Sequence, residues 1–409
     1  MKRFIEVCRI VGVATVEVAV FMALATSPVA AQQRIEGVFN GHRIIYPASS
    51  IPVPGRMHTN YFFVDTDQLQ SGGPPSGVES PGSVACVYEL VTGPAGCPVA
   101  TSTNVPTGGW GAIAIVDAGY YPTAATDLAQ FSSYYNIPAA DFTQVWVGKK
   151  QPPTYSDWEV EEALDIEWAH AMAPAAKLYL VVSPLCNTDC ATDPTWSAIT
   201  LATKLVKEAG GGVVSMSFGD SEGTYELQHD KIFKNKKVVY FAASGDGGLG
   251  VSIYPGSSPN VVSVGGTYFN RDQSGKFTYE QWYTNGGGGD ISPYETRPAY
   301  QNGVSGIVGN NRGYPDVASD FCCAGIVLGG GWGSVGGTSW ASPTMAGMVN
   351  AAGNKAKGSV AELTMIYDEL ANPTEYAAYF NDITTGGSEC VTGFDTCTGI
   401  GSVKTYVGK

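Results

Sequence analysis

From Gly109 onward, the chain alternates between short apolar segments and longer segments with helical periodicity. No other feature limits the possible folds as much, because strands that alternate with helices build a parallel sheet through right-handed crossovers. We therefore predict an α/β fold with a doubly wound, mostly parallel sheet and helices on both faces. The apolar segments predict strands over residues 112–116, 177–182, 213–217, 238–243 and 261–264. The periodic segments predict helices over residues 123–135, 156–173, 194–209, 222–234 and 338–352.

Residues 32–108 differ from the rest of the chain, because they are rich in Gly, Pro and Ser and have few long apolar periods. They predict an irregular N-terminal extension, followed by one large domain over residues 109–409. In open α/β sheets, ligands bind beyond the carboxyl ends of the strands. Functional residues are therefore expected in the segments that follow the predicted strands.

The first 31 residues have the pattern of a secretory signal peptide. Lys2 and Arg3 begin a basic segment, residues 10–25 are apolar except for Glu17, and small residues precede a cleavage site after Ala31. A membrane anchor is the alternative, but Glu17 leaves too short an apolar run to span a bilayer. We expect cleavage after residue 31, a secreted or extracytoplasmic protein, and no membrane association once the signal is removed.

The cysteines agree with export. Eight of the nine lie outside the predicted signal peptide, and an even number suits disulfides in an oxidising compartment. The adjacent Cys322 and Cys323 are left unassigned. Close spacing predicts three local bridges, Cys86–Cys97, Cys186–Cys190 and Cys390–Cys397.

The charge balance removes several classes of partner. The chain has 23 Lys and Arg against 37 Asp and Glu, a formal net charge of -14, and it has no basic block, which argues against nucleic acid or an anionic membrane. Charged residues make up only 15%, too few for a coiled coil. Only four His are present, so chemistry based on His has few possible positions.

The most specific motif is the segment 336–347, GGTSWASPTMAG, in which a Gly pair leads into Ser339 at the first turn of an apolar helix. A helix N-terminus presents free N–H groups and partial positive charge, which would stabilise a developing oxyanion. The simpler interpretation is that Thr338 or Ser339 only caps the helix. The length of the motif favours a nucleophile, as in subtilisin-type proteases and their acid-acting relatives.

A subtilisin-type site also needs an Asp and a His in a His-Gly context. Asp117 follows a predicted strand and fits the first, but no His in this chain precedes Gly. Glu161 and Asp165 offer another base, because residues four apart share one face of a helix. Two close carboxylates share a proton and can accept one in acid, where a His would already be charged. The alternative is a solvated acidic helix face.

Together, the carboxylate segment 161–167, the segment 171–177 (AMAPAAK) and the segment 336–347 resemble the sedolisins, or serine-carboxyl peptidases, including kumamolisin-like members. The resemblance covers roughly residues 105–403. It implies a subtilisin-like fold and peptide-bond hydrolysis at acid pH through an acyl-enzyme. Sedolisin precursors usually carry a large folded pro-domain, and residues 32–108 do not resemble one.

The resemblance also implies the roles of individual residues. Ser339 would be the nucleophile, Glu161 the general base, and Asp165 would orient Glu161 and share its proton. Asp246, in Ala-Ala-Ser-Gly-Asp after a predicted strand, would supply the oxyanion hole, for which it must be protonated. A Gly-Asp turn is the simpler interpretation of Asp246 alone.

The segment 215–219, SMSFG, resembles the edge on which sedolisins bind extended substrates, with Ser215, Ser217 and Gly219 as contacts. The chain departs from the family at two positions of the proton network. Phe218 stands where some members have Trp, and Asp117 stands where some have Glu.

One structural Ca²⁺ site near the C-terminus is also implied by the resemblance, because two carboxylates and several carbonyls form a hard oxygen site. The implied ligands are the side chains of Asp382 and Asp395 and the carbonyls of Ile383, Val391 and Gly393. From spacing alone, the same residues form a disulfide loop with incidental acids.

The sequence therefore predicts a secreted serine-type endopeptidase that acts on polypeptides as a monomer, with no nucleic-acid partner. A catalytically silent secreted protein with the same fold is one alternative, and a neutral subtilisin-like protease is another. The joint presence of Ser339, Glu161, Asp165 and Asp246 favours the acid peptidase, and the lack of a His-Gly pair argues against the neutral one.

Overall fold

The computed structural model describes residues 35–39, 41–185, 193–283, 287–353 and 357–407. The chain divides into a short unit that ends at Gln33 and a compact unit from Arg34 to Lys409, and only the second is described below. The predicted signal peptide and the predicted Cys186–Cys190 bridge lie outside the described residues.

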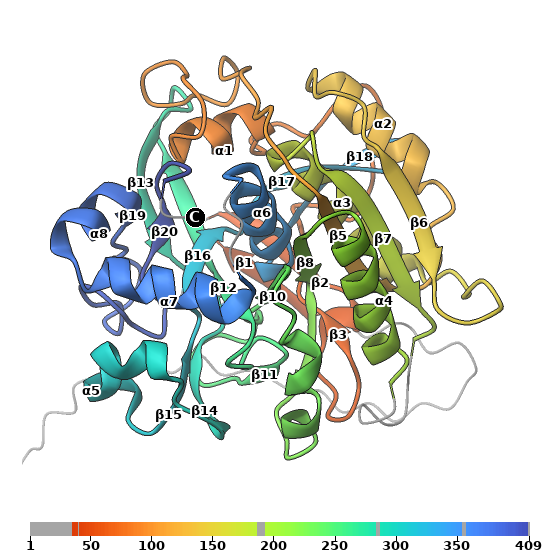
Figure 1. Cartoon of the computed structure of the whole chain (residues 1–409). Helices are drawn as coiled ribbons and strands as arrows, with labels where there is room; N and C mark the ends of the chain where they lie inside the picture. Colours follow the sequence, from red (N-terminus) through yellow and green to blue (C-terminus); the bar gives the residue numbers. More distant parts are fainter. Residues whose placement is uncertain (1–34, 40, 186–192, 284–286, 354–356, 408–409) are drawn as a thin grey trace, which may run out of the picture. The chain divides into compact units, whose positions relative to one another are not determined.

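A ten-stranded sheet forms the centre of the described part of the compact unit (Figure 1). Its main path runs in the order β19-β20-β16-β12-β10-β8-β5-β7-β6, with β13 paired to β12. The pairs from β6 to β20 are parallel, and β13 and β19 are antiparallel additions. The strands span Ala112–Ala118 (β5), Phe142–Trp146 (β6), Lys177–Ser183 (β7), Gly212–Met216 (β8), Val238–Ala243 (β10), Val262–Arg271 (β12), Phe277–Trp282 (β13), Val317–Asp320 (β16), Phe380–Asn381 (β19) and Ser402–Val403 (β20).

Helices cover both faces of this sheet, as predicted. Side chains of a strand alternate between faces, so Ile113 and Ile115 of β5 join the core with α2, α3 and α6, whereas Ala114 and Val116 join the core with α4. The fold is thus the predicted α/β arrangement. The helices span Pro81–Val87 (α1), Ala124–Tyr134 (α2), Ser156–Met172 (α3), Thr195–Glu208 (α4), Ser305–Val308 (α5), Thr338–Ala351 (α6), Ser359–Leu370 (α7) and Pro373–Tyr379 (α8).

One predicted helix is wrong. Residues 222–234 do not form an α-helix but two short 3-10 turns, Glu226–Gln228 and Asp230–Phe233. Their apolar residues have helical spacing, but Asp230 is buried and accepts hydrogen bonds from Tyr254 and Ser258, which fixes a tighter turn.

The N-terminal extension is also different from the prediction, because residues 35–108 belong to the same compact unit as the large sheet. Three of its strands, β1 (Ile35–Phe39), β2 (His42–Tyr46) and β4 (Phe62–Val64), form an antiparallel five-stranded sheet with β18 and β17 in the order β1-β2-β4-β18-β17. The two C-terminal partners span Ala324–Leu328 (β17) and Gly331–Gly336 (β18). The predicted boundary at residue 108 is therefore not a structural one.

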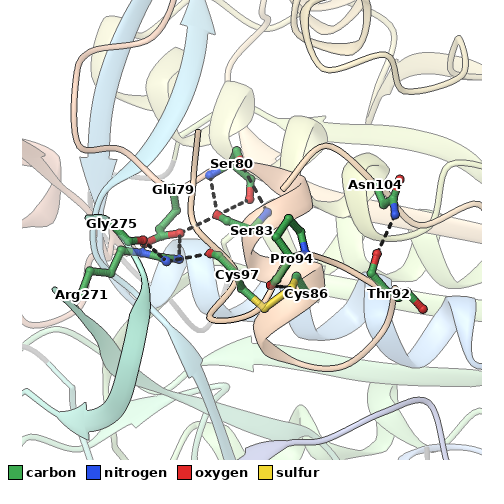
Figure 2. Close-up of a disulfide and its surroundings, with 10 residues drawn as sticks. All are labelled: Glu79, Ser80, Ser83, Cys86, Thr92, Pro94, Cys97, Asn104, Arg271 and Gly275. Carbon is green, nitrogen blue, oxygen red and sulfur yellow. Dashed lines mark hydrogen bonds and ion pairs between the residues drawn. A yellow bond between two sulfur atoms is a disulfide. The ribbon is translucent and has the colours of Figure 1, made fainter. Parts of the chain in front are cut away.

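The later part of the extension is anchored by charge and by a disulfide (Figure 2). Arg271 at the end of β12 forms a bidentate ion pair with Glu79, with N–O distances of 2.5 and 2.6 Å, and both side chains are largely buried. Arg271 also donates to the carbonyl of Cys97, which is bonded to Cys86. Such buried, doubly hydrogen-bonded pairs fix geometry.

Two further disulfides are formed among the described residues, between Cys390 and Cys397 and between the adjacent Cys322 and Cys323 that the sequence left unassigned. Three smaller strands, β3 (His58–Thr59), β9 (Phe218–Ser221) and β11 (Ile253–Tyr254), form a sheet in the order β11-β9-β3, and β14 (Asp290–Thr296) pairs with β15 (Asn311–Tyr314). Within the part of the chain that the structure describes, no helix has the length and apolarity that crossing a membrane requires.

Candidate active site

Ser339 lies in the first turn of α6, immediately after β18 delivers the chain through Gly337. Gly337 has a φ of 131°, a conformation that favours glycine. A Cβ atom at this position would lie 2.1 Å from the carbonyl oxygen of Asn60 and 2.6 Å from Oδ2 of Asp246, so no larger residue fits. The predicted Gly pair thus serves a close approach of backbone to the site.

Pro343 explains how Ser339 is joined to the neighbouring strand segment. Proline has no N–H, so the carbonyl of Ser339, four residues earlier, lacks its usual helical donor. The hydroxyl of Ser217 lies 3.1 Å from this carbonyl oxygen and 2.7 Å from Oδ2 of Asp165. Ser217 therefore links the nucleophile helix to the carboxylate helix.

Helix α3 supplies the carboxylates. It packs against α6, where Trp168 and Trp340 meet with ring centroids 4.6 Å apart. Glu161 and Asp165 lie one turn apart and are both completely buried. Asp117 at the end of β5 is also buried. Its pKa is raised first by burial and then by the charges of Asp165 and Glu161, so Asp117 lies near this pair. The structure thus brings together three acids that the sequence singled out.

Burial and the neighbouring Asp165 raise the pKa of Glu161 well above its ordinary value, while the hydroxyl of Ser339 and the N–H of Asn60 oppose this rise. Burial likewise raises the pKa of Asp165, and its hydrogen bond from Ser217 opposes the rise. Two such groups hold a proton between them far above the pH at which a free carboxyl ionises. Neither Glu161 oxygen has a hydrogen bond of good geometry, because the Ser339 hydroxyl donates to the carbonyl of Ser217 instead, at 2.9 Å.

Asp246 lies where an oxyanion-hole donor is needed. Its Oδ1 accepts hydrogen bonds from the N–H and the hydroxyl of Thr338, both at 2.8 Å. Its Oδ2 is buried without a partner, although part of the residue is exposed. Burial raises the pKa of Asp246 to about 8, against the two hydrogen bonds from Thr338. Below that pH the acid is protonated, so that Oδ2 is able to donate.

The predicted substrate contacts Ser215 and Gly219 lie in different sheets, in β8 and β9. Gly219 pairs with His58, and the carbonyl of Ser217 accepts a hydrogen bond from Nδ2 of Asn60 at 3.1 Å. The prediction that Ser215 contacts substrate is wrong, because Ser215 lies in β8 between β5 and β10 and has no free strand edge. Its hydroxyl is 2.9 Å from that of Ser342, inside the core.

The sequence did not predict the part that two residues take in the site. Thr338 was considered only as a helix cap, yet its side chain holds Asp246. Asn60 comes from the extension, and its backbone N–H donates to Oγ of Ser339 at 3.1 Å while its carbonyl accepts from the N–H of Ser339 at 3.1 Å. No pattern in a Gly- and Pro-rich segment points to a residue 279 positions before its partner.

The C-terminal loop does not offer the donor set that calcium requires. Oδ1 of Asp395 accepts from the N–H groups of Cys397 and Thr398, and Oδ2 accepts from Val391. The carboxylate of Asp382 accepts from the N–H of Gly393. A cation needs carbonyl oxygens from this loop, but here its N–H groups face both carboxylates.

A cluster of Cys390, Asp395 and Cys397 is the one group among the described residues with spacing suited to a metal, but its two sulfurs are bonded to each other. The calcium site therefore stays a prediction from the family resemblance. The loop does not direct carbonyl oxygens toward the carboxylates of Asp382 and Asp395, as such a site would require.

Removal of divalent cations is consequently expected to leave the melting temperature almost unchanged. A calcium site at 100-fold saturation would contribute about 2.7 kcal/mol, which is about 3–4 °C for a unit of this size. The measurement is thermal unfolding of the Ser339→Ala protein, which cannot digest itself, in excess calcium and in excess chelator. A melting temperature that is higher by this amount in calcium than in chelator would support the calcium site.

Relatives of this chain are found among curated proteins and among solved structures. No family model matches the chain. It is 26% identical to xanthomonalisin of Xanthomonas sp. (strain T-22) over 86% of this chain and 49% of the relative. It is 30% identical to kumamolisin of Bacillus sp. (strain MN-32) over 68% of this chain and 55% of the relative. The chain thus spans about half the length of the curated relatives it matches.

Among solved structures, a Pseudomonas sedolisin, a serine-carboxyl proteinase complexed with pseudo-iodotyrostatin, matches with a TM-score of 0.63 at 22% identity, over 82% of this chain and 96% of that one. Sphericase matches with a TM-score of 0.52 at 19% identity, over 81% of this chain and 99% of that one. Sheet order and these matches define a subtilisin-like α/β fold. The chain belongs to the sedolisin family.

Proposed function

We propose that this protein is a serine-type endopeptidase of the serine-carboxyl class, which hydrolyses polypeptides at acid pH. The observation that carries the proposal is the meeting of Ser339, at a helix N-terminus, with the buried pair Glu161 and Asp165. Among the described residues, Oγ of Ser339 hydrogen-bonds to the N–H of Asn60 and the carbonyl of Ser217, and no His bonds to it. A carboxylate base is therefore the better candidate.

In the proposed reaction, Oγ of Ser339 attacks the carbonyl carbon of the scissile peptide bond and its proton passes to Glu161. The oxyanion accepts hydrogen bonds from the N–H of Ser339 and from protonated Asp246. Glu161 then returns the proton to the leaving amine as the C–N bond breaks. Water hydrolyses the acyl-enzyme with Glu161 again as base, which regenerates Ser339. Asp165 orients Glu161 and holds the second proton position.

The direct test is cleavage of casein between about pH 2.5 and 8 by the wild type and by Ser339→Ala. Cleavage in acid that Ser339→Ala lacks is the expected result. An optimum near pH 8 would contradict the carboxylate base, and cleavage that survives in Ser339→Ala would contradict the nucleophile. The absence of cleavage at every pH would favour the silent protein. Export and a monomeric state are part of the proposal and are tested by fractionation and by light scattering.

Replacement of Asp246 by Ala is expected to lower kcat about 10²- to 10³-fold, the usual loss when one oxyanion-hole donor is removed. Asp246→Asn keeps a donor that does not ionise. It is therefore expected to retain more activity than Asp246→Ala. Its kcat is also expected to decline less at alkaline pH, because the decline that ionisation of Asp246 causes near its pKa of about 8 is absent. The measurement is kcat against pH for both variants. Equal loss in both, with an unchanged alkaline limb, would contradict the role of Asp246.

A further inference from the structure

The adjacent cysteines Cys322 and Cys323 form a disulfide in the segment that joins β16 to β17. A disulfide stabilises a protein mainly by restricting its unfolded chain, and this restriction grows with the length of the loop that the bond closes. Between neighbouring residues, that loop has the shortest possible length. The bridge therefore contributes little to global stability, and its effect is expected in the local backbone instead.

The bridge holds Cys323 in a conformation that a free cysteine avoids. The φ angle of Cys323 is 80°, in the left-handed region that favours glycine. In this conformation its carbonyl accepts the N–H of Glu79 at 2.8 Å, and Glu79 is fixed by its ion pair with Arg271 (Figure 2). Once the two sulfur atoms part, Cys323 is free to return to a negative φ, which turns this carbonyl away from Glu79. The segment thus has two backbone states, and the disulfide selects one of them.

The same segment positions the start of the nucleophile helix. Phe321, the residue before the bridge, donates its N–H to the carbonyl of Thr267 in β12 at 2.9 Å and accepts the N–H of Gly337 at 2.7 Å. Gly337 leads directly to the first turn of α6, which contains Ser339. A displacement of about 1 Å at a reacting group can lower a rate about 10²-fold. A backbone change at Cys323 is therefore expected to reach Ser339 through Phe321 and Gly337.

A cavity of about 770 Å³ gives access to the bridge, although Cys322 is only 2% exposed and Cys323 only 5%. Both cysteines line this cavity, and so do Asp272, Gln273 and Ser274 of the β12–β13 turn, which are exposed. At about 30 Å³ for each water molecule, the cavity has room for about 25 waters, much more than a small dithiol such as dithiothreitol displaces. A reductant of this size therefore reaches the sulfur atoms without unfolding of the chain.

We propose that the Cys322–Cys323 disulfide is a redox modification site, at which a small dithiol opens the bridge and thereby lowers the activity of Ser339. A thiolate of the dithiol attacks one of the two sulfur atoms, the protein S–S bond breaks, and a mixed disulfide forms. The second thiol of the reductant then displaces the remaining cysteine sulfur. The reductant leaves as a cyclic disulfide, and two electrons and two protons are left on the cysteines as two thiols. The effect on activity rests on the proposed function, whereas the modification itself does not.

The first test is reduction of the wild type with dithiothreitol at about pH 7.5, where part of the reductant is thiolate. Cleavage of a fluorogenic peptide is then measured in acid, where exchange stops because the thiols are protonated. The expected result is a fall in kcat/KM of at least about tenfold, because Ser339 is displaced, and oxidation with diamide is expected to reverse it.

Site-resolved labelling is needed beside this assay, because Cys86–Cys97 and Cys390–Cys397 are disulfides as well. Free thiols are alkylated with iodoacetamide and located by mass spectrometry. Loss of activity without label at Cys322 and Cys323 would overturn the proposal, and so would label at both without loss of activity.

Two double variants separate the backbone conformation from the bridge. In Cys322→Ser/Cys323→Ser the bridge is absent and serine also avoids the left-handed region, so its activity is expected to match that of the reduced wild type. In Cys322→Ser/Cys323→Gly the bridge is absent too, but glycine keeps a φ of 80° without strain. Its activity is therefore expected to stay close to that of the oxidised wild type. Equal activity of the two variants would overturn the proposal, because residue 323 would then not control Ser339.

Two further results keep a folding defect and a failed function apart from this outcome. Both variants are expected to melt close to the wild type, because the bridge closes the shortest loop. If neither the oxidised wild type nor the Cys322→Ser/Cys323→Gly variant cleaves a peptide at any pH, the proposed function has failed, and the effect on activity with it. Labelling still decides the site, because Cys322 and Cys323 that stay unlabelled in the folded, dithiol-treated protein would overturn it whatever the activity.

Discussion

Glu161→Gln is expected to lower kcat/KM for peptide cleavage about 10⁴-fold, the loss typical of removing the base that serves a serine nucleophile. The carboxamide keeps the size of the side chain but cannot accept the Ser339 proton. The assay compares Glu161→Gln with the unsubstituted protein on a fluorogenic peptide at acid pH. Both proteins are compared at equal thermal stability, so that a folding defect is not mistaken for a catalytic one.

Glu162→Gln is the matched control for this variant. Glu162 is the next residue of α3, it is equally buried, and neither of its carboxyl oxygens has a hydrogen-bond partner. Its loss is expected to change kcat/KM by less than about tenfold, or 1.4 kcal/mol. If Glu161→Gln and Glu162→Gln behave alike, Glu161 is not the base.

The free energy of unfolding is expected to fall as the pH rises from about 4 to 9, the opposite of the usual maximum between about pH 5 and 8. Burial raises the pKa of Asp246 to about 8, of Glu295 to about 8 and of Glu226 to about 9, and in an unfolded chain these groups ionise near pH 4. A group whose pKa is raised by folding stabilises the folded state below its unfolded pKa. That contribution is lost as the pH rises through its folded pKa.

Each tenfold change in proton affinity is worth about 1.4 kcal/mol, so these acids together contribute several kcal/mol to the difference between pH 4 and pH 8. Urea unfolding of the Ser339→Ala protein at these two pH values measures it without self-digestion. Ser339→Ala with Asp246→Asn, which removes one titrating group, is expected to show a smaller difference. Equal transition midpoints at both pH values would contradict the role of the buried acids.

The central part of the fold was predictable because its signals are local. Strand β5 and helices α3 and α6 lie within one or two residues of their predicted bounds, since a buried strand reads as a continuous apolar run and a buried helix as a periodic one. The catalytic candidates followed from motifs within α3, α6 and the turn after β10.

What the sequence did not show depends on distant pairing. Strands β1, β2 and β4 are three to five residues long and gain stability only beside β18, almost 300 positions later. A segment of this kind has little periodicity of its own, so it was predicted to be irregular. The role of Asn60 was missed for the same reason. The prediction for Ser215 was wrong because the segment 215–219 was treated as one strand edge, whereas the chain passes from one sheet to another after Met216.

The pairing of β4 with β18 also bears on how this protein associates with itself. Phe62 and Phe63 of β4 oppose Gly336 and Val335, and they cover an apolar strand that would otherwise present unpaired N–H and C=O groups to the solvent. Uncovered strand edges of this kind are sites of intermolecular pairing. A chain that began at residue 109 would expose such an edge beside its own nucleophile helix, and would be prone to aggregate through it rather than to gain a more open active site.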